Sequence, residues 1–165
     1  MKKAGILVVE DEQVIAMSIS KSLERLGYSV VDVVNAGDVA VSRALDLSPD
    51  LILMDIMLEG SMDGIETART LRARTDIPVI YLTAYADTAT VERARETMPY
   101  SFLNKPINER DLFSNIESAL YKHTMERKLA ESEAMLRSIV RAAPIGIGMV
   151  AGPDNALVWC NSALC

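Results

Sequence analysis

Short apolar segments alternate with segments of helical spacing along most of the chain. The apolar runs, such as GILVV at 5–9, are typical of strands that are buried on both faces. The segments between them place apolar residues three and four positions apart, as amphipathic helices do. The predicted strands are 5–9, 28–34, 51–54, 79–82 and 101–104, and the predicted helices are 13–26, 38–47, 63–74, 87–98 and one that begins near 109.

This alternation indicates an α/β fold, with a doubly wound parallel sheet of five strands and helices on both faces. Ligands of such sheets bind at the carboxyl edge, near the point where the strand order reverses. Polar residues follow four of the predicted strands at that edge. They are Glu10, Asp11 and Glu12 after the first strand, and then Asp55, Thr83 and Lys105.

Each of these residues has an ordinary explanation when it is taken alone. The acids at 10–12 could charge the start of a helix, and Thr83 could cap one. Asp55 could be a turn acid, and Lys105 could be a solvated side chain. Independent accidents do not explain why all of them fall at one edge of the sheet. We therefore interpret them as one site.

The residue types at this edge indicate phosphoryl chemistry. Crowded carboxylates need a cation, and ligands that are all oxygen favour a hard ion such as Mg²⁺ or Mn²⁺. With that ion bound, Asp55 can stay ionised and act as a nucleophile that forms an aspartyl phosphate. Lys105 would neutralise charge on the transferred phosphoryl oxygens, and Thr83 could hydrogen-bond one of them.

Composition narrows the class of protein further. The formal net charge is −6, so direct contact with nucleic acid, which needs clustered cations, is not expected. No apolar run reaches the length of a membrane span. The two cysteines, Cys160 and Cys165, make neither a disulfide framework nor a four-ligand metal site. These features favour a cytoplasmic protein.

The last helix is predicted to continue from 109 to about 141, because no Pro or Gly interrupts it. Beyond Tyr121 its apolar positions are separated alternately by four and three residues, which is the spacing of a heptad seam. About two heptads are present, so the segment either pairs with another helix or is a solvated helix with scattered apolar residues. The seam positions are Met125, Leu129, Ser132, Leu136 and Ile139.

Five segments of the chain resemble the motifs of the receiver domain of two-component response regulators. The resemblance covers about residues 4–122 and implies a flavodoxin-like sheet in the strand order 2-1-3-4-5, with an extended C-terminal helix. It also implies a signalling module rather than an enzyme, which receives a phosphoryl group from a histidine kinase or a phosphotransfer protein. The segments are VVEDE (8–12), LILMDIML (51–58), MDGIE (62–66), YLTAY (81–85) and FLNKP (102–106).

The resemblance assigns a phosphoacceptor and a set of metal ligands. Asp55 corresponds to the phosphoacceptor. Glu10 and Asp11 correspond to the acid pair that holds Mg²⁺ together with Asp55, and the backbone carbonyl of Met57 corresponds to a further ligand. Glu10 stands where Asp is commoner in the family, so its contact with the metal is expected to pass through water.

The resemblance also assigns the residues that respond to phosphorylation. Thr83 corresponds to the switch hydroxyl, Phe102 to the switch aromatic residue and Lys105 to the phosphate-binding ammonium. The Lys105-Pro106 peptide bond is expected to be cis. The surface formed by the fourth helix, the fifth strand and the fifth helix is the one expected to change.

The loop after Asp55 departs from the family pattern. Many receivers have Pro four residues after the acceptor and Gly eight residues after it. Here Glu59 and Asp63 occupy those places, and Gly64 comes one position late. The segment LEGSMDG is therefore expected to carry one extra residue.

The C-terminal segment from 127 to 165 resembles a signalling helix that runs into the start of a PAS module. We therefore expect three parts: a receiver domain at 1–122, a helical linker able to form a coiled coil at 123–141, and the truncated start of a PAS domain at 142–165. A strand is predicted within 152–161. The signal is expected to pass along the last helix to a downstream PAS or output region, with a homodimer formed through the last face or the linker helix.

Two alternative functions fit parts of the sequence. An Asp-nucleophile, Mg²⁺-dependent phosphohydrolase of the haloacid dehalogenase type would carry a second acid two residues after the nucleophile, where this chain has Met57. A receiver that no longer accepts phosphate is the other alternative. The complete set of Asp11, Asp55, Thr83 and Lys105 argues against it.

Overall fold

The computed structural model describes residues 3–84, 88–143, 148–151 and 156–160. The chain divides into two compact units, Met1–Lys122 and His123–Cys165, and each is described by itself below. No helix in the described ranges combines the length and the apolar character that crossing a membrane requires.

Five parallel strands form the sheet of the first unit, in the order β2-β1-β3-β4-β5. This order confirms the predicted flavodoxin-like fold. The strands are β1 (Gly5–Val9), β2 (Ser29–Val34), β3 (Leu51–Asp55), β4 (Val79–Thr83) and β5 (Ser101–Asn104). The helices are α1 (Gln13–Arg25), α2 (Gly37–Leu47), α3 (Gly64–Arg72), α4 (Thr88–Glu96) and α5 (Glu109–Ala142).

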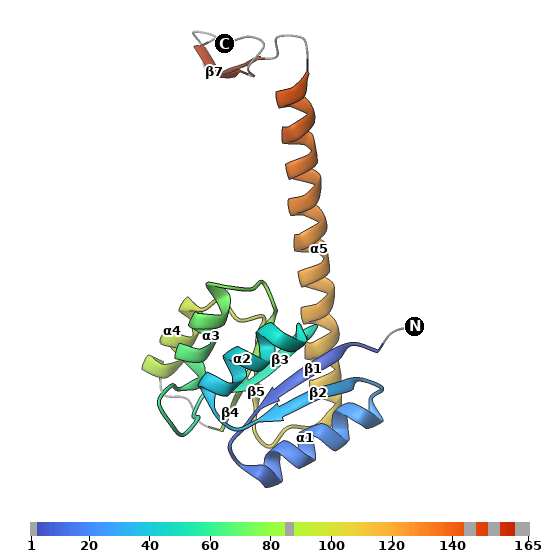
Figure 1. Ribbon diagram of the computed structural model, residues 1–165, viewed down its shortest axis with the longest axis vertical. Coiled ribbons are helices and arrows are strands. Elements are labelled where there is room, and N and C mark those ends of the chain that lie inside the picture. The colour runs from blue at the N-terminus through green and yellow to red at the C-terminus, as the bar shows by residue number, and fades with distance from the viewer. Residues whose placement is uncertain (1–2, 85–87, 144–147, 152–155, 161–165) are drawn as a thin grey trace. The chain divides into compact units, whose positions relative to one another are not determined.

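The sheet separates two apolar clusters, with α1 and α5 over one face and α2, α3 and α4 over the other (Figure 1). Successive strand residues point to opposite faces, so one strand supplies both clusters. In β1, Ile6 and Val8 join the cluster under α1 and α5, while Leu7 and Val9 join the opposite one. This double burial explains why the central strands are continuous apolar runs.

Helix α5 has 34 residues, and its first part packs on the sheet. Leu112, Ile116 and Ala119 are its buried residues. Two polar contacts also join this part to the region around the end of α1. Arg25 forms an ion pair with Glu109, and the Tyr28 hydroxyl donates a hydrogen bond to Glu117 at 2.7 Å. The predicted continuous last helix is confirmed.

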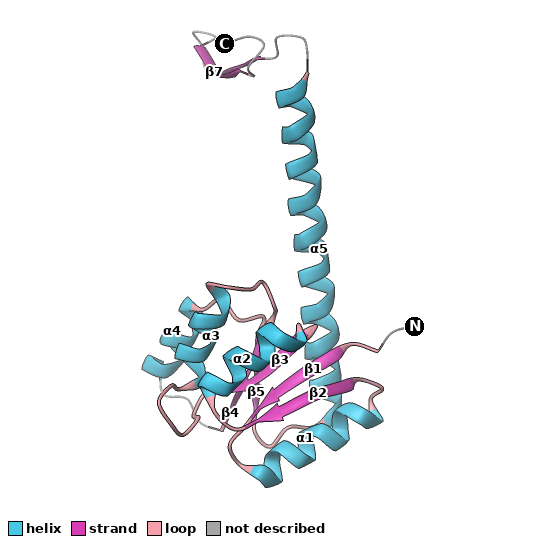
Figure 2. Cartoon of the chain, viewed as in Figure 1, coloured by secondary structure: helices cyan, strands magenta, loops and turns pink. Residues whose placement is uncertain are grey.

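The second unit contains the C-terminal part of α5 and a two-stranded antiparallel sheet (Figure 2). Its strands are β6 (Gly148–Ala151) and β7 (Ala156–Cys160). Strand β7 falls within the predicted strand, whereas β6 was not predicted, because its sequence is rich in small residues and lacks alternation. Parts of the expected PAS start, at 144–147, 152–155 and 161–165, lie outside the described residues. Cys160 is disulfide-bonded.

The loop between β3 and α3 ends in a well-formed helix cap. Asp63 is the N-cap of α3: its carboxylate accepts from the Glu66 N–H at 2.8 Å, and Glu66 Oε2 accepts from the Asp63 N–H at 3.2 Å. The next residue, Gly64, donates its N–H to the Ile56 carbonyl at 3.0 Å. A Cβ atom on Gly64 would lie only 1.8 Å from the Asp55 backbone oxygen. Glycine at 64 therefore lets the loop after β3 close directly against the end of that strand.

Replacing Gly64 with alanine should destabilise the first unit by at least about 2 kcal/mol, because the methyl group would overlap backbone rather than a movable side chain. Urea unfolding of Gly64→Ala and wild type measures the difference. Ser61→Ala, at an exposed position of the same loop, is the control and should change stability by less than about 0.5 kcal/mol. Equal midpoints for Gly64→Ala and wild type would contradict this account of the loop.

Candidate functional site

The carboxyl ends of four neighbouring strands meet at one edge of the sheet. Glu10 directly follows β1, Asp55 ends β3, Thr83 ends β4 and Lys105 directly follows β5. These strands are adjacent in the order β1-β3-β4-β5, which brings residues that are distant in sequence to the same place. The chain order reverses between β1 and β3, so the edge lies at the switch point of the sheet.

The Lys105 ammonium lies between two buried carboxylates. Its Nζ atom is 2.7 Å from Asp55 Oδ2 and 2.9 Å from Glu10 Oε1, and it donates a hydrogen bond to each. The side chains of Lys105, Glu10 and Asp55 expose only 11%, 0% and 6% of their surfaces. Ion pairs buried to this degree are screened far less by solvent than surface pairs are.

Burial changes the protonation behaviour of this group. Loss of solvent raises the pKa of Glu10 to about 7, and the nearby Asp55 charge adds to the rise, while Lys105 opposes it. Burial lowers the pKa of Lys105, but its hydrogen bonds to Asp55 and Glu10 outweigh that effect and leave the pKa above its ordinary value. Folded Glu10 therefore keeps its proton to a higher pH than an ordinary glutamic acid does.

Three acids at this edge are close enough to share a cation. Glu10, Asp11 and Asp55 each offer a carboxylate oxygen, and these oxygens all lie within 4.8 Å of one another. The Lys105 ammonium contacts both oxygens of the Glu10 carboxylate, with Nζ 2.9 Å from Oε1 and 2.7 Å from Oε2. An oxygen-only donor set of this kind fits a hard divalent ion.

Backbone groups of the following loop hold two of these carboxylates in place. The Met57 N–H donates to Asp55 Oδ1 at 3.1 Å, and the Glu59 N–H donates to Asp11 Oδ2 at 3.1 Å. The Met57 side chain is itself 69% exposed. Glu12, by contrast, is exposed at the N-cap of α1, where its side chain makes no capping hydrogen bond.

Thr83 and Phe102 lie on the neighbouring strands β4 and β5. Thr83 is buried at the end of β4, and its carbonyl accepts a hydrogen bond from the Lys105 N–H at 2.7 Å. Phe102 is half-buried and packs against Tyr81, with 5.6 Å between the ring centroids. The Lys105-Pro106 peptide bond is cis, as expected.

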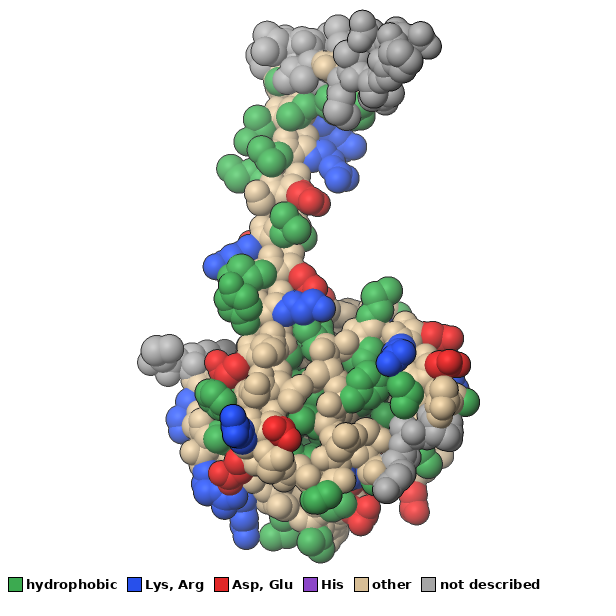
Figure 3. Space-filling view, turned by 180° about the vertical axis from the view of Figure 1, so that it is seen from behind, with side chains coloured by type: hydrophobic (Ala, Val, Ile, Leu, Met, Phe, Trp, Pro, Cys, Tyr) green, Lys and Arg blue, Asp and Glu red, His purple; other side chains and the backbone are tan. Residues whose placement is uncertain are grey.

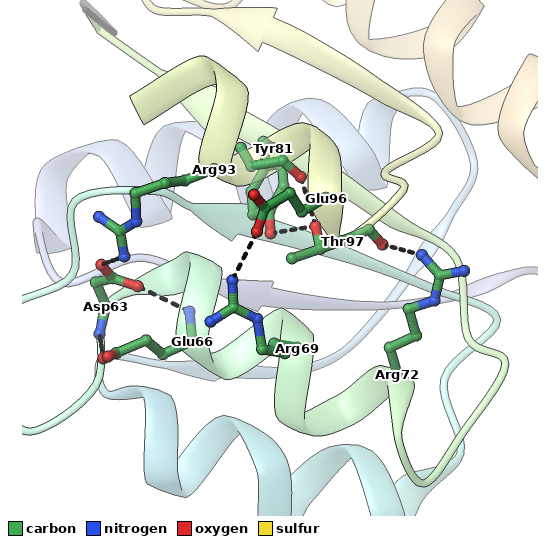
Figure 4. Close-up of polar contacts among 9 residues, drawn as sticks. Asp63, Glu66, Arg69, Arg72, Tyr81, Arg93, Glu96 and Thr97 are labelled. Carbon is green, nitrogen blue, oxygen red and sulfur yellow. Dashed lines mark hydrogen bonds and ion pairs between the residues drawn. The ribbon is translucent and has the colours of Figure 1, made fainter. Parts of the chain in front are cut away.

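A buried hydrogen-bond chain connects Tyr81 to the end of α4 (Figure 4). Thr97 donates its hydroxyl hydrogen to the Ala94 carbonyl at 2.7 Å, so the Tyr81 hydroxyl is the donor in its 2.8 Å contact with Thr97. Burial raises the pKa of Tyr81 to about 12. The ring that contacts Phe102 is thus fixed to α4.

Two ion pairs also join α3 to α4 in Figure 4. Arg93 lies 2.9 Å from the Asp63 carboxylate, and Arg69 lies 3.2 Å from that of Glu96. Sequence reasoning missed these contacts and the Tyr81 connection. No local pattern signals them, because each partner lies 16 to 30 residues away in sequence.

Residues 6–117 match the response regulator receiver domain family. The match spans more than half of the chain, and the chain belongs to this family.

Curated relatives agree with this assignment. The chain is 35% identical to the transcriptional regulatory protein PdtaR of Mycobacterium tuberculosis over 115 residues, which is 70% of this chain and 56% of PdtaR. It is 33% identical to the DNA-binding response regulator MtrA of Mycobacterium leprae over 121 residues, 73% of this chain and 53% of MtrA. The chain therefore spans about half the length of the curated relatives that it matches.

Solved structures of receiver domains are also similar. The signal receiver domain of a modulated diguanylate cyclase from Desulfovibrio desulfuricans G20 is 41% identical, with a TM-score of 0.73 over 76% of this chain and 99% of that one. The N-terminal domain of a response regulator/sensory box/GGDEF three-domain protein from Carboxydothermus hydrogenoformans is 35% identical, with a TM-score of 0.67 over 74% of this chain and 98% of that one.

Without added metal, the free energy of unfolding should decrease as the pH rises from about 4.5 to above 7. Folded Glu10 keeps its proton up to about pH 7, whereas in the unfolded chain its pKa is the ordinary 4.5, so only the folded state is protonated in this window. The loss should be about 3 kcal/mol from this carboxyl. Urea unfolding at about pH 5 and about pH 8 measures it.

Glu10→Gln should remove this part of the pH dependence, because the amide does not titrate. Glu24→Gln, an exposed change in α1, is the matched control and should keep it. If Glu10→Gln retained the full wild-type pH dependence, Glu10 would not be its source.

Proposed function

We propose that this chain is a phosphorylation-switched receiver in which Asp55 accepts a phosphoryl group from the phosphohistidine of a kinase or a phosphotransfer protein. The observation that carries the proposal is the position of Asp55, which ends β3 within 2.7 Å of the Lys105 ammonium and beside Glu10 and Asp11. Membership of the receiver family supports the same reaction class.

In the proposed reaction, an Asp55 carboxylate oxygen forms a bond to phosphorus while the bond from phosphorus to the donor nitrogen breaks. The hydrogen bond from the Met57 N–H holds Oδ1 of Asp55 in place. The Lys105 ammonium would then pair with the negatively charged phosphoryl oxygens. This pairing is the electrostatic stabilisation that such a transfer needs.

Glu10, Asp11 and Asp55 would hold Mg²⁺ or Mn²⁺, with the Met57 carbonyl as a further ligand. When bound, the ion neutralises charge on the phosphoryl group during transfer. Glu10 is buried and its Oε2 atom lies 2.7 Å from Lys105 Nζ, so we propose that its contact with the ion passes through water. Because ionised Glu10 is costly without a cation, a bound ion would favour its charged form.

The response to phosphorylation is assigned to Thr83 and Phe102. The Thr83 hydroxyl would move toward the phosphoryl group, and the Phe102 ring would turn inward. Phe102 rests on Tyr81, whose hydroxyl is bonded to Thr97 after α4. Movement of Phe102 would therefore disturb the packing on which the end of α4 depends.

The only reactions proposed for the chain are its own phosphorylation and dephosphorylation, and we propose no separate substrate. The phosphohydrolase alternative has no support: the family match is to receivers, and Met57 occupies the position where such an enzyme needs an acid. The clustered Asp11, Asp55 and Lys105 also argue against a receiver that has lost phosphate acceptance.

Acetyl phosphate with Mg²⁺ should label the wild-type chain once and leave Asp55→Asn unlabelled, because the amide is not a nucleophile at this position. Mass spectrometry of the intact chain at acidic pH measures the label. Asp46→Asn, an exposed change in α2, is the control and should be labelled like wild type. Equal labelling of Asp55→Asn and wild type would refute the assignment, and continuous turnover of a small phosphate ester would favour the hydrolase.

The proposed organisation has a receiver at 1–122, a helical linker at 123–141 and the start of a PAS domain at 142–165. Continuity of α5 across the first two parts supports signal transfer along it. The similar Carboxydothermus protein combines a response regulator with a sensory box and GGDEF, which suits a sensory module followed by an output domain.

The proposed location is the cytoplasm, where histidine kinases phosphorylate their partners. The disulfide at Cys160 is unusual for a reducing compartment. The proposed homodimer forms through the last face of the receiver or through the linker helix, without direct contact to nucleic acid.

A chain ending at residue 141 should associate more strongly than one ending at 122, because only the longer chain carries the exposed apolar positions of α5 beyond Tyr121. Sedimentation equilibrium of both chains, with and without beryllofluoride, measures the monomer fraction. Equal monomer fractions for the two lengths under both conditions would exclude the linker as the site of association.

A further inference from the structure

The C-terminal part of α5 carries a row of large apolar side chains exposed to solvent. Met125 is 39% exposed, Leu129 62%, Leu136 59% and Ile139 55%. Figure 3 shows hydrophobic side chains between charged ones along this part of the helix. Scattered single apolar residues are normal on a surface, but a row in heptad register is the pattern of a helix that packs against another helix.

The spacing assigns each residue a heptad position. With Leu129 and Leu136 at a, positions d are Met125, Ser132 and Ile139. Lys128 then falls at g and Glu133 at e, the two positions that flank such a seam and form ion pairs between helices. Neither Lys128 nor Glu133 forms an ion pair within the described part of its own chain, so both charges are available to a partner.

The charges favour a second copy of the same chain in one orientation. In two parallel helices in register, a residue at g faces the residue at e five positions later in the other helix. Lys128 of each copy would therefore face Glu133 of the other, giving two attractive pairs. In an antiparallel pair, e faces e and g faces g, which would separate these opposite charges and bring Glu126 and Glu133 together.

We propose that residues 125–139 form a parallel, in-register two-stranded coiled coil with a second copy of this chain, with orientation set by Lys128 and Glu133 across the interface. The proposal rests on the proposed function for the idea of a homodimer and adds its surface, orientation and register. Ser132 is the weak point of this seam. Its small polar side chain occupies the central d position, where an apolar side chain would fill the space between the helices.

Charge reversal in the full chain tests the orientation. Lys128→Glu and Glu133→Lys should each weaken self-association roughly 3- to 30-fold at low salt, because each turns two attractive pairs into two repulsive ones. The double variant should recover the wild-type dissociation constant. An equimolar mixture of the two single variants should form heterodimers in preference to either homodimer, because both cross-pairs are then attractive. Sedimentation equilibrium and native mass spectrometry measure these outcomes.

The matched control reverses an ion pair that lies within one helix. Arg127 and Glu131 pair at i and i+4, and they occupy the outward positions f and c. Arg127→Glu combined with Glu131→Lys should leave the dissociation constant unchanged. Unchanged association in Lys128→Glu and Glu133→Lys, or no preference for heterodimers in the mixture, would overturn the orientation and register.

Substitution of the central serine tests the seam itself. Ser132→Leu should tighten self-association roughly 10-fold or more, because it places a leucine from each copy in the interface. Ser138→Leu adds the same side chain at position c, away from the seam, and should not tighten it. Equal effects of the two substitutions, or a wild-type chain that stays monomeric at all concentrations, would overturn the proposal.

Labelling of Asp55 with acetyl phosphate on the same samples separates the two levels of inference. If Asp55 is labelled but the substitutions at Lys128, Ser132 and Glu133 leave self-association unchanged, the coiled coil is refuted and the phosphoacceptor assignment stands. If these substitutions change self-association as predicted but Asp55 takes no label, the coiled coil is supported and the phosphoacceptor assignment is refuted. A different partner on this surface, such as an unrelated helix, would leave the wild-type chain monomeric and so also count against a second copy.

Discussion

The buried Lys105 ammonium between Glu10 and Asp55 is the interaction on which the site depends. Two carboxylates in one nearly water-free place repel each other, and the nearby cation makes the arrangement tolerable. Removing one member of such a group typically costs about 3–5 kcal/mol, because it leaves uncompensated buried charge. The strand order places this cation at the site, since β3, β4 and β5 are successive neighbours and Lys105 immediately follows β5.

The same arrangement keeps the site ready for a second cation. One ammonium carries less charge than Glu10, Asp11 and Asp55 would carry together when ionised, and burial, aided by the nearby Asp55 charge, raises the pKa of Glu10. Lys105 thus makes the buried carboxylates tolerable in the folded chain, and the three acids can still accommodate more positive charge. This charge balance suits the phosphoryl transfer proposed for Asp55, in which the negative charge at that residue increases.

Helix α5 has two regions with different physical roles. Its first turns bury Leu112, Ile116 and Ala119 on the sheet, so this region is held by the hydrophobic core of the first unit. Further along, Leu129 and Leu136 remain exposed, and helix propensity alone stabilises few helices of this kind in water. One continuous helix therefore joins a region that is packed on the sheet to a region whose apolar side chains are exposed to solvent.

Local patterns in the sequence determined the order of the elements, the sheet edge at which the polar residues gather and the length of α5. Double burial leaves a continuous apolar run such as GILVV, and the absence of Pro and Gly, which end or kink helices, indicated how far α5 could continue. Tertiary structure alone decided the rest. The raised pKa of Glu10, the Tyr81–Thr97 hydrogen bond and the need for glycine at 64 each depend on atoms from distant segments. Such contacts have no periodicity, because their partners meet only after the strands have paired, and a single sequence therefore does not reveal them.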